Sequence, residues 1–230
     1  MPLQGQVQIE VDFDDPLVQA LIDRFHFQYR DAGLQMNPED IDQVVEEMVV
    51  AYQSPYRRHH TLRHIGEIHD ELQPVSSKLF NPVGVAFAVD MHDVVQVSRA
   101  FQHDVELSLQ WGQTVLDVYS APAANFVSYK PCVMVTQHTG GQPGSVDAQY
   151  MSDADLSILG KPPKRYKQYA KDIRFEFRWV PKPMFRARRA EILQGFLDRP
   201  RIYWTQHFYD SYEEQARENL RREIAELTKT

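Results

Sequence analysis

Hydrophobic and polar residues alternate along the first thirteen positions, and the pattern then changes to a helical period. Apolar residues at every second position from Val7 to Phe13 predict a short strand or an extended N-terminal arm over residues 1–15. After Pro16 the apolar residues recur every four positions, at Leu17, Leu21, Phe25 and Tyr29. This spacing places them on one face of a helix, so the chain is expected to become helical there.

Helix-start signals recur further along the chain. Asn37-Pro38-Glu39-Asp40 combines an N-cap, a proline in the first turn and early acidic residues, and it predicts a helix to about Gln53. Asn81-Pro82 repeats the signal. Further helical patterns cover approximately residues 103–119, 122–138, 147–159, 163–178, 183–198 and 207–228. Because no other stretch alternates, we expect an all-α bundle that forms a single domain over residues 1–230.

Composition narrows the class of protein. Hydrophobic residues make up 43% of the 230 residues, which is typical of a globular protein. The single cysteine, Cys132, excludes an intramolecular disulfide and a cysteine-rich zinc module, and it favours a reducing compartment. The longest uninterrupted apolar run, from Val83 to Val89, is far shorter than the ~20 residues of a membrane helix. We therefore expect a cytoplasmic protein without a membrane segment or a leader peptide.

Common nucleotide-binding and hydrolase motifs are missing from the sequence. Gly140, Gly141 and Gly144 mark a loop, but no Gly-Lys-Ser/Thr follows them to form a P-loop. The chain also lacks a Gly-x-Ser-x-Gly elbow and a dinucleotide-binding fingerprint. Nucleotide binding by these routes is not expected.

Charge is distributed unevenly along the chain. The formal net charge is −7, but residues 161–201 carry 13 Lys and Arg against 4 Asp and Glu. This basic segment either forms a solvated helix face or helps to hold a phosphorylated substrate. Its candidates for substrate contact include Lys161 and Arg165.

Histidine and aspartate residues form the most informative pattern. His92-Asp93 lies within an apolar stretch, where ionisable side chains are costly unless they are paired or bind a metal. His60 and His64 share one helix face because they are four residues apart. Asp153 and Asp155 are two apart and do not share a face, so only one of them is expected to reach the same site. Nitrogen and oxygen donors in this combination suit a divalent metal ion.

Other polar residues are candidates for supporting roles. His138 precedes the glycine loop and is a candidate for substrate contact or for an additional metal ligand. Glu106, with Asp104, follows the His-Asp pair and either orients the metal ligands by hydrogen bonds, binds a second metal ion or lies on an exposed helix face. The aspartate of the 153–155 pair that does not bind the metal would cap a helix or orient a ligand histidine.

Taken in order, these motifs resemble the HD superfamily of metal-dependent phosphohydrolases, and most closely its small bacterial-type family of predicted HD phosphohydrolases. The resemblance covers about residues 50 to 227 and rests on four segments: Tyr56 to Ile65, ending in His-Thr-Leu-x-His-Ile; Met91-His92-Asp93; Ser152 to Gly160, which contains Asp-Ala-Asp-Leu; and Arg199 to Tyr203. It implies an all-α fold that binds a divalent metal ion, namely Mn, Mg, Fe, Ni or Zn.

A more distant similarity to cyclic-nucleotide phosphodiesterases assigns individual roles. Their Tyr-His-Asn-x-x-His-Ala segment implies that His60 is a proton donor and His64 a metal ligand, while another HD alignment makes His60 the first ligand. Their Ala-Asp-Leu-Ser motif selects Asp155 over Asp153. The implied metal ligands are His64, His92, Asp93 and Asp155, and the implied catalytic residues are His60 and Asp93.

We therefore expect a hydrolase that acts on a nucleotide or another small phosphorylated metabolite. Two alternatives remain open. The residues that follow Asp93 differ from the small family's usual Ala-Val-Tyr, which permits a degenerate HD-fold module that contacts nucleic acid or a protein partner. A di-iron oxygenase would need a further ligand such as His138.

Overall fold

A computed structural model describes residues 11–96, 102–139 and 141–229 of the chain. Within these ranges the protein is built from helices and contains no strand, as the sequence predicts. Residues 1–10, which carry most of the alternating pattern, lie outside the described part. The segment from Val11 to Asp15 forms no strand.

The helices begin where their capping residues predict. Asp15 caps α1 (Pro16–Asp23) by accepting from the N–H groups of Leu17 and Val18. Asn37 and Asp40 form a reciprocal capping box at the start of α2 (Pro38–Tyr52), and proline occupies the first turn. The remaining α-helices are α3 (Leu62–Leu72), α4 (Pro82–Met91), α5 (Gln102–Val118), α6 (Tyr129–Val135), α7 (Val146–Asp155), α8 (Pro163–Glu176), α9 (Lys182–Leu197) and α10 (Gln206–Thr228).

Some predicted helices are interrupted. The helix expected from Leu17 to Tyr29 becomes a π-helix after Asp23, over Arg24–Tyr29. The pattern at 122–138 is split into a 3-10 turn at Ala123–Phe126 and the short helix α6. A side chain explains the split, because Ser128 donates its hydroxyl proton to Asp147 at 2.6 Å and its N–H to Asn81.

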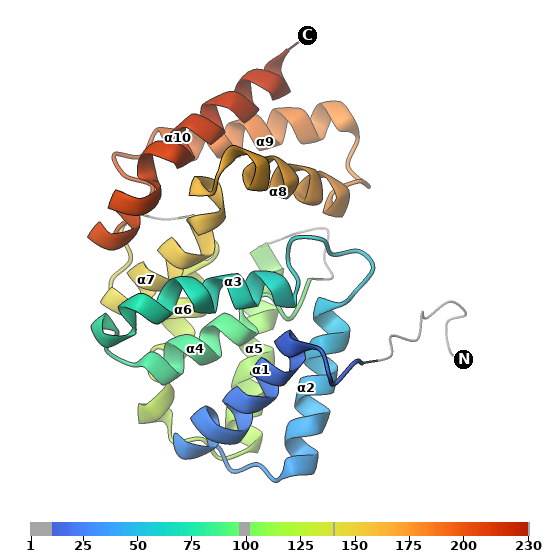
Figure 1. Ribbon diagram of the computed structural model, residues 1–230, viewed down its shortest axis with the longest axis vertical. Coiled ribbons are helices and arrows are strands. Elements are labelled where there is room, and N and C mark those ends of the chain that lie inside the picture. Colours follow the sequence, from blue (N-terminus) through green and yellow to red (C-terminus); the bar gives the residue numbers. More distant parts are fainter. Residues whose placement is uncertain (1–10, 97–101, 140, 230) are drawn as a thin grey trace.

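Helices from distant parts of the sequence surround a common core. In Figure 1, α8, α9 and α10 lie together at one end of the molecule, α1 and α2 lie at the other, and α3, α4, α6 and α7 lie between them. A continuous cluster of buried apolar side chains runs from Val18 in α1 to Leu220 in α10. α4 is central to this core: every residue from Gly84 to Met91 is buried, including Asp90.

No helix in the described ranges combines the length and the apolar character needed to cross a membrane.

Candidate metal centre

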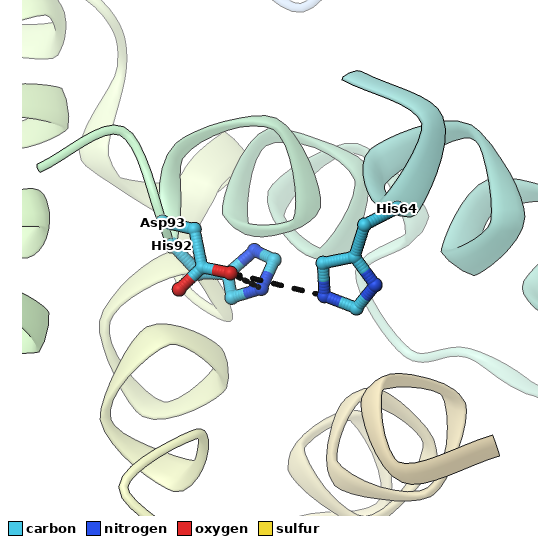
Figure 2. Close-up of side chains that lie close together, drawn as sticks. All are labelled: His64, His92 and Asp93. Atoms are coloured by element: carbon cyan, nitrogen blue, oxygen red, sulfur yellow. Dashed lines mark ion pairs between the residues drawn. The ribbon is translucent and has the colours of Figure 1, made fainter. Parts of the chain in front are cut away.

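Three helix ends bring the predicted metal ligands together. His64 lies in the first turn of α3, His92 is the C-cap residue of α4 with Asp93 directly after it, and Asp155 is the last residue of α7. Because α4 ends at Met91, the two adjacent residues His92 and Asp93 leave the helical spacing and can face one point. Figure 2 shows the side chains of His64, His92 and Asp93 converging.

The ligand atoms lie within a few ångströms of one another. His92 Nε2 is 3.1 Å from Asp93 Oδ2, and His64 Nε2 is 3.1 Å from Asp155 Oδ1. The crossed distances are 3.8 Å from His64 Nε2 to Asp93 Oδ2 and 3.7 Å from His92 Nε2 to Asp155 Oδ1. The donor atoms of His64, His92 and Asp93 all fall within 4.8 Å of one another. The group could therefore hold a metal ion.

Two buried nitrogen atoms are compatible with a metal ion at this point. The Nε2 atoms of His64 and His92 are buried and make no hydrogen bond. His92 Nδ1 donates to the backbone carbonyl of Val89 at 2.9 Å. This bond keeps one proton on Nδ1, so Nε2 is the atom that faces the carboxylates and that would bind a metal ion after losing its own proton.

The histidines and carboxylates of the centre shift the pKa values of one another. Burial alone would lower the pKa of His92, but the neighbouring Asp93 and Asp155 together outweigh burial and raise that pKa well above its usual value. Burial alone would raise the pKa of Asp93, but His92, followed by His60, holds that pKa well below its usual range. Burial alone would also raise the pKa of Asp155, but His138, which is hydrogen-bonded to it, and the two histidines of the centre hold that pKa well below its usual value. Asp93 and Asp155 are therefore both ionised at neutral pH, and a cation bound here would compete with protons for the histidines.

His138 contacts Asp155, a predicted metal ligand, directly. Its Nε2 atom is 2.9 Å from Asp155 Oδ2, the carboxylate oxygen that does not face His64. The backbone of His138 has a left-handed conformation with φ of 51°, and its carbonyl accepts a hydrogen bond from Arg199 at 2.6 Å. In this position His138 orients Asp155, in addition to lining the adjoining cavity.

His60, the predicted proton donor, lies in the loop before α3 because that helix begins only at Leu62, so the predicted helix face shared with His64 does not form. It is held by a residue that the sequence pattern did not single out. Its Nδ1 atom lies 2.6 Å from Glu176 Oε2 at the end of α8. The other oxygen of Glu176 accepts the backbone N–H groups of Arg58, His59 and His60. Burial alone would lower the pKa of His60, but Glu176, together with the charge of Asp93, outweighs burial and raises that pKa. The pKa of Glu176 falls to about 2, because His60 and the N–H donors outweigh its burial.

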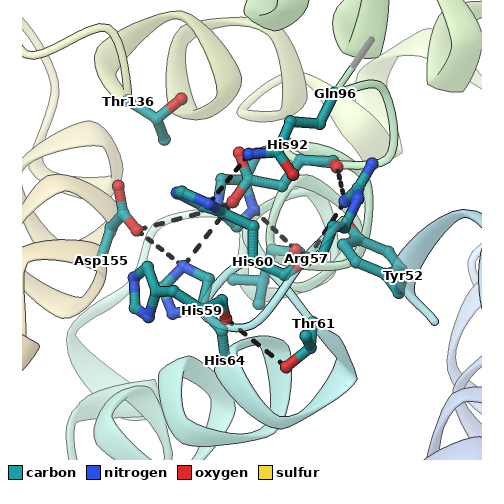
Figure 3. A network of polar contacts seen from close by, with 12 residues as sticks. Tyr52, Arg57, His59, His60, Thr61, His64, His92, Gln96, Thr136 and Asp155 are labelled. Atoms are coloured by element: carbon teal, nitrogen blue, oxygen red, sulfur yellow. Dashed lines mark hydrogen bonds and ion pairs between the residues drawn. The ribbon is translucent and has the colours of Figure 1, made fainter. Parts of the chain in front are cut away.

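Arg57 joins the His60 loop to the His92-Asp93 segment (Figure 3). Its buried guanidinium donates to the carbonyl oxygens of Asp93 at 2.6 Å and Val94 at 2.9 Å, and to that of His60 at 3.3 Å. It also lies over the ring of Tyr52 at 5.2 Å. These contacts fix the distance between the predicted proton donor and the metal ligands.

A cavity of about 290 Å³ opens onto the centre. Asp93, Asp155, His59, His60 and His138 line its polar end. The sequence did not single out His59, whose buried ring packs at 4.5 Å from the ring of His64 and at 4.6 Å from that of Tyr169. A small substrate could reach the metal ligands and His60 from the same space.

The other predicted site residues lie elsewhere. Asp153 accepts from the N–H groups of Trp204 and Thr205, the two residues that directly precede α10, and from the Thr205 hydroxyl. Burial raises its pKa to about 6. Glu106 accepts from Gln137 at 3.2 Å and is paired with the exposed His103.

The two basic residues that were predicted to contact the substrate form ion pairs away from the cavity. Lys161 is paired with Glu71, and Arg165 is paired with Glu67 at 2.7 Å. Neither side chain is among the residues that line the cavity. Both instead tie the start of α8 to α3.

Comparisons of the chain with protein-family models, with curated proteins and with solved structures found no match.

Proposed function

We propose that this protein is a metal-dependent phosphohydrolase that acts on a small phosphorylated substrate. The observation that carries the proposal is the pair of buried Nε2 atoms of His64 and His92, which make no hydrogen bond and each lie 3.1 Å from an ionised carboxylate beside a cavity. Two imidazoles and two carboxylates form a donor set for Mn, Mg, Fe, Ni or Zn. The resemblance of the motifs to HD phosphohydrolases points to the same chemistry.

The residues of the chain would divide the work of hydrolysis. A divalent ion, when bound, supplies positive charge that polarises a phosphoryl oxygen and acidifies a coordinated water. Asp93 remains ionised and orients the attacking water by accepting a hydrogen bond from it, and as the water oxygen bonds to phosphorus the proton that it loses passes to the phosphate product. As the P–O bond of the ester breaks, His60 in its imidazolium form gives the proton on Nε2 to the leaving oxygen. His60 keeps the proton on Nδ1, which is hydrogen-bonded to Glu176. General acid catalysis of this kind contributes about 10²–10⁴ in rate.

The test combines metal content with phosphate release. Wild-type protein should bind a stoichiometric divalent metal and release phosphate from members of a panel of phosphate esters and nucleotides. His92→Ala and Asp93→Ala should each lose both properties, because each removes a ligand. His103→Ala is the matched control, since this histidine is 75% exposed and contacts only Glu106 among the ion pairs of the described residues. Wild-type protein that binds none of the five metals would refute the proposal.

The same sample separates the two alternative functions. A di-iron oxygenase would retain iron and consume oxygen during turnover. A degenerate binding module would bind RNA or a protein without turnover, and RNA binding would weaken steeply with salt. The pairing of Lys161 and Arg165 with glutamates disfavours an RNA-binding role for these two cations.

A further inference from the structure

The cavity beside the candidate metal centre is lined by two kinds of side chain. One kind is polar and comprises the carboxylates and histidines described above, with Thr136, Gln137 and Thr139. Much of the rest of the lining is apolar, formed by Leu156, Ile158, Leu159, Ile192, Leu193 and Phe196. A molecule that reaches Asp93 and Asp155 with a phosphate group would therefore place much of its remaining surface against this apolar wall.

Arg189 is the one Lys or Arg among the described residues that line this cavity, and its charge is already balanced. Its Nε atom is 3.0 Å from Glu223 Oε1, and both side chains are only 10% exposed. The guanidinium also lies over the ring of Tyr169 at 5.2 Å. Proteins that hold a chain of phosphates normally supply several cationic groups beyond the metal. The described lining offers none for a second or third phosphate.

The size of the cavity sets a second limit. Its volume of about 290 Å³ is at the lower end of the range of about 300–1,000 Å³ for small-molecule sites. Together, the volume, the apolar wall and the neutralised arginine favour a compact ligand with a single anionic group.

We propose that the substrate is a phosphate monoester whose remaining part is small, uncharged and largely apolar, rather than a nucleoside polyphosphate. This inference rests on the proposed function and narrows its substrate class. Ile192 is the residue expected to enforce the preference at the cavity mouth, because it lines the cavity and is 42% exposed, whereas Leu193 beside it is fully buried.

Binding of unreactive alkylphosphonates to protein saturated with Mn²⁺ tests the inference without relying on turnover. Methyl-, ethyl-, propyl- and butylphosphonate share one anionic head, so they differ only in the apolar part. Each methylene that becomes buried should lower Kd about fourfold. Butylphosphonate should also bind about tenfold or more tightly than 3-phosphonopropionate, because the carboxylate of the latter would be desolvated without a partner.

A pair of lysine variants in α9 assigns the preference to the cavity wall. Ile192→Lys places a cation at the mouth and should abolish or reverse the preference for butylphosphonate over 3-phosphonopropionate. Met184→Lys is the control: Met184 is 64% exposed, lies in the same helix and does not line the cavity. This variant should bind both ligands as the wild type does.

The outcomes separate failure of the inference from failure of the proposed function. Binding of the phosphonates without dependence on chain length, or tighter binding of 3-phosphonopropionate, would overturn the apolar substrate class and leave the phosphohydrolase proposal intact. If metal-saturated protein binds none of the phosphonates, the inference is overturned, and the phosphate-release assay alone decides the proposed function. If the protein binds none of Mn, Mg, Fe, Ni and Zn, both are overturned.

Discussion

Glu176 connects the fold to the chemistry of His60. One carboxylate oxygen accepts three consecutive backbone N–H groups, and the other faces His60 Nδ1. A single side chain therefore fixes both the loop and the protonation of the histidine that the loop carries. Such a carboxylate partner raises the pKa of an imidazole, which therefore stays protonated up to a higher pH.

Replacing Glu176 by glutamine should shift the alkaline limb of the pH–rate profile to lower pH. The amide retains an acceptor for the backbone N–H groups but removes the charge that raises the pKa of His60 above its usual value. A general acid is active only below its pKa, so activity should be lost at a lower pH in the variant. The measurement is kcat from pH 5 to 9.

Gln96→Ala provides the matched control for this shift. Gln96 Nε2 lies 3.1 Å from His60 Nδ1 but carries no charge. Its removal should leave the alkaline limb nearly in place. An unchanged limb in Glu176→Gln would show that Glu176 has only a structural role.

Sequence motifs identified the residues that converge but not the residue that orients the proton donor. His64, His92, Asp93 and Asp155 belong to short motifs whose order carried the resemblance. Glu176 is 116 residues from His60 and lies in a segment whose visible property is its positive charge. No local pattern marks such a partner, because the contact is created only when α8 packs against the His60 loop.

At the scale of helices, the end of α7 serves two purposes. Asp155 points into the metal centre, whereas Asp153 accepts three hydrogen bonds at the start of α10. Spacing alone predicted that only one of the two would reach the site. Which of them does so depends on where α10 begins, and that is a tertiary contact.

Alanine substitutions at Asp153 and Asp155 should have opposite effects. Asp153→Ala leaves two N–H groups and a hydroxyl without an acceptor, so it should lower the free energy of unfolding by about 1–3 kcal/mol while metal binding persists. Asp155→Ala should abolish metal binding and change the stability of the metal-free protein much less. Urea unfolding and metal analysis of both variants measure this. Loss of metal from Asp153→Ala at full stability would contradict the assignment.

Helix boundaries were predictable where capping chemistry is local. Asn37-Pro38 marks the start of α2 correctly, and its capping box is present. The break between the Ala123–Phe126 turn and α6 was not predicted. The interaction of Ser128 with Asp147 that accompanies this break spans 19 residues and is invisible in the hydrophobic period.

Across the whole molecule, a buried charge network joins the N-terminal helices to the site-bearing helices. Arg24 in the π segment binds both carboxylate oxygens of Asp90 in α4, at 2.8 to 3.1 Å. His69 in α3 lies 2.8 Å from the same carboxylate, and the Tyr29 hydroxyl donates to it. Asp90 is fully buried, and Arg24 outweighs that burial to hold its pKa well below the usual range.

Asp90→Asn should lower the free energy of unfolding by about 3–5 kcal/mol, because it leaves the charge of Arg24 without its partner in a buried site. Metal stoichiometry should be retained in the fraction that remains folded. The pKa of Asp90 is lower in the folded protein than in the unfolded chain, so Asp90 stabilises the fold above its pKa in the unfolded chain, about 3.9. This stabilisation is lost as the pH falls below that value. A change below about 1 kcal/mol in urea unfolding at pH 7 would contradict this account.

The metal should couple the two halves of the chain, since its ligands come from α3, α4 and α7. A ligand that binds only the folded state stabilises it by RT ln(1 + [L]/Kd), about 2.7 kcal/mol at a concentration one hundred times Kd. For a chain of this size that corresponds to a rise in Tm of about 5–10 °C. Calorimetry with and without Mn²⁺ should show the rise in wild type and in His103→Ala but not in His92→Ala, and a chelator should reverse it. Equal Tm values with and without Mn²⁺, Zn²⁺ and Fe²⁺ would mean that the convergent histidines and carboxylates form ion pairs with one another and bind no metal ion.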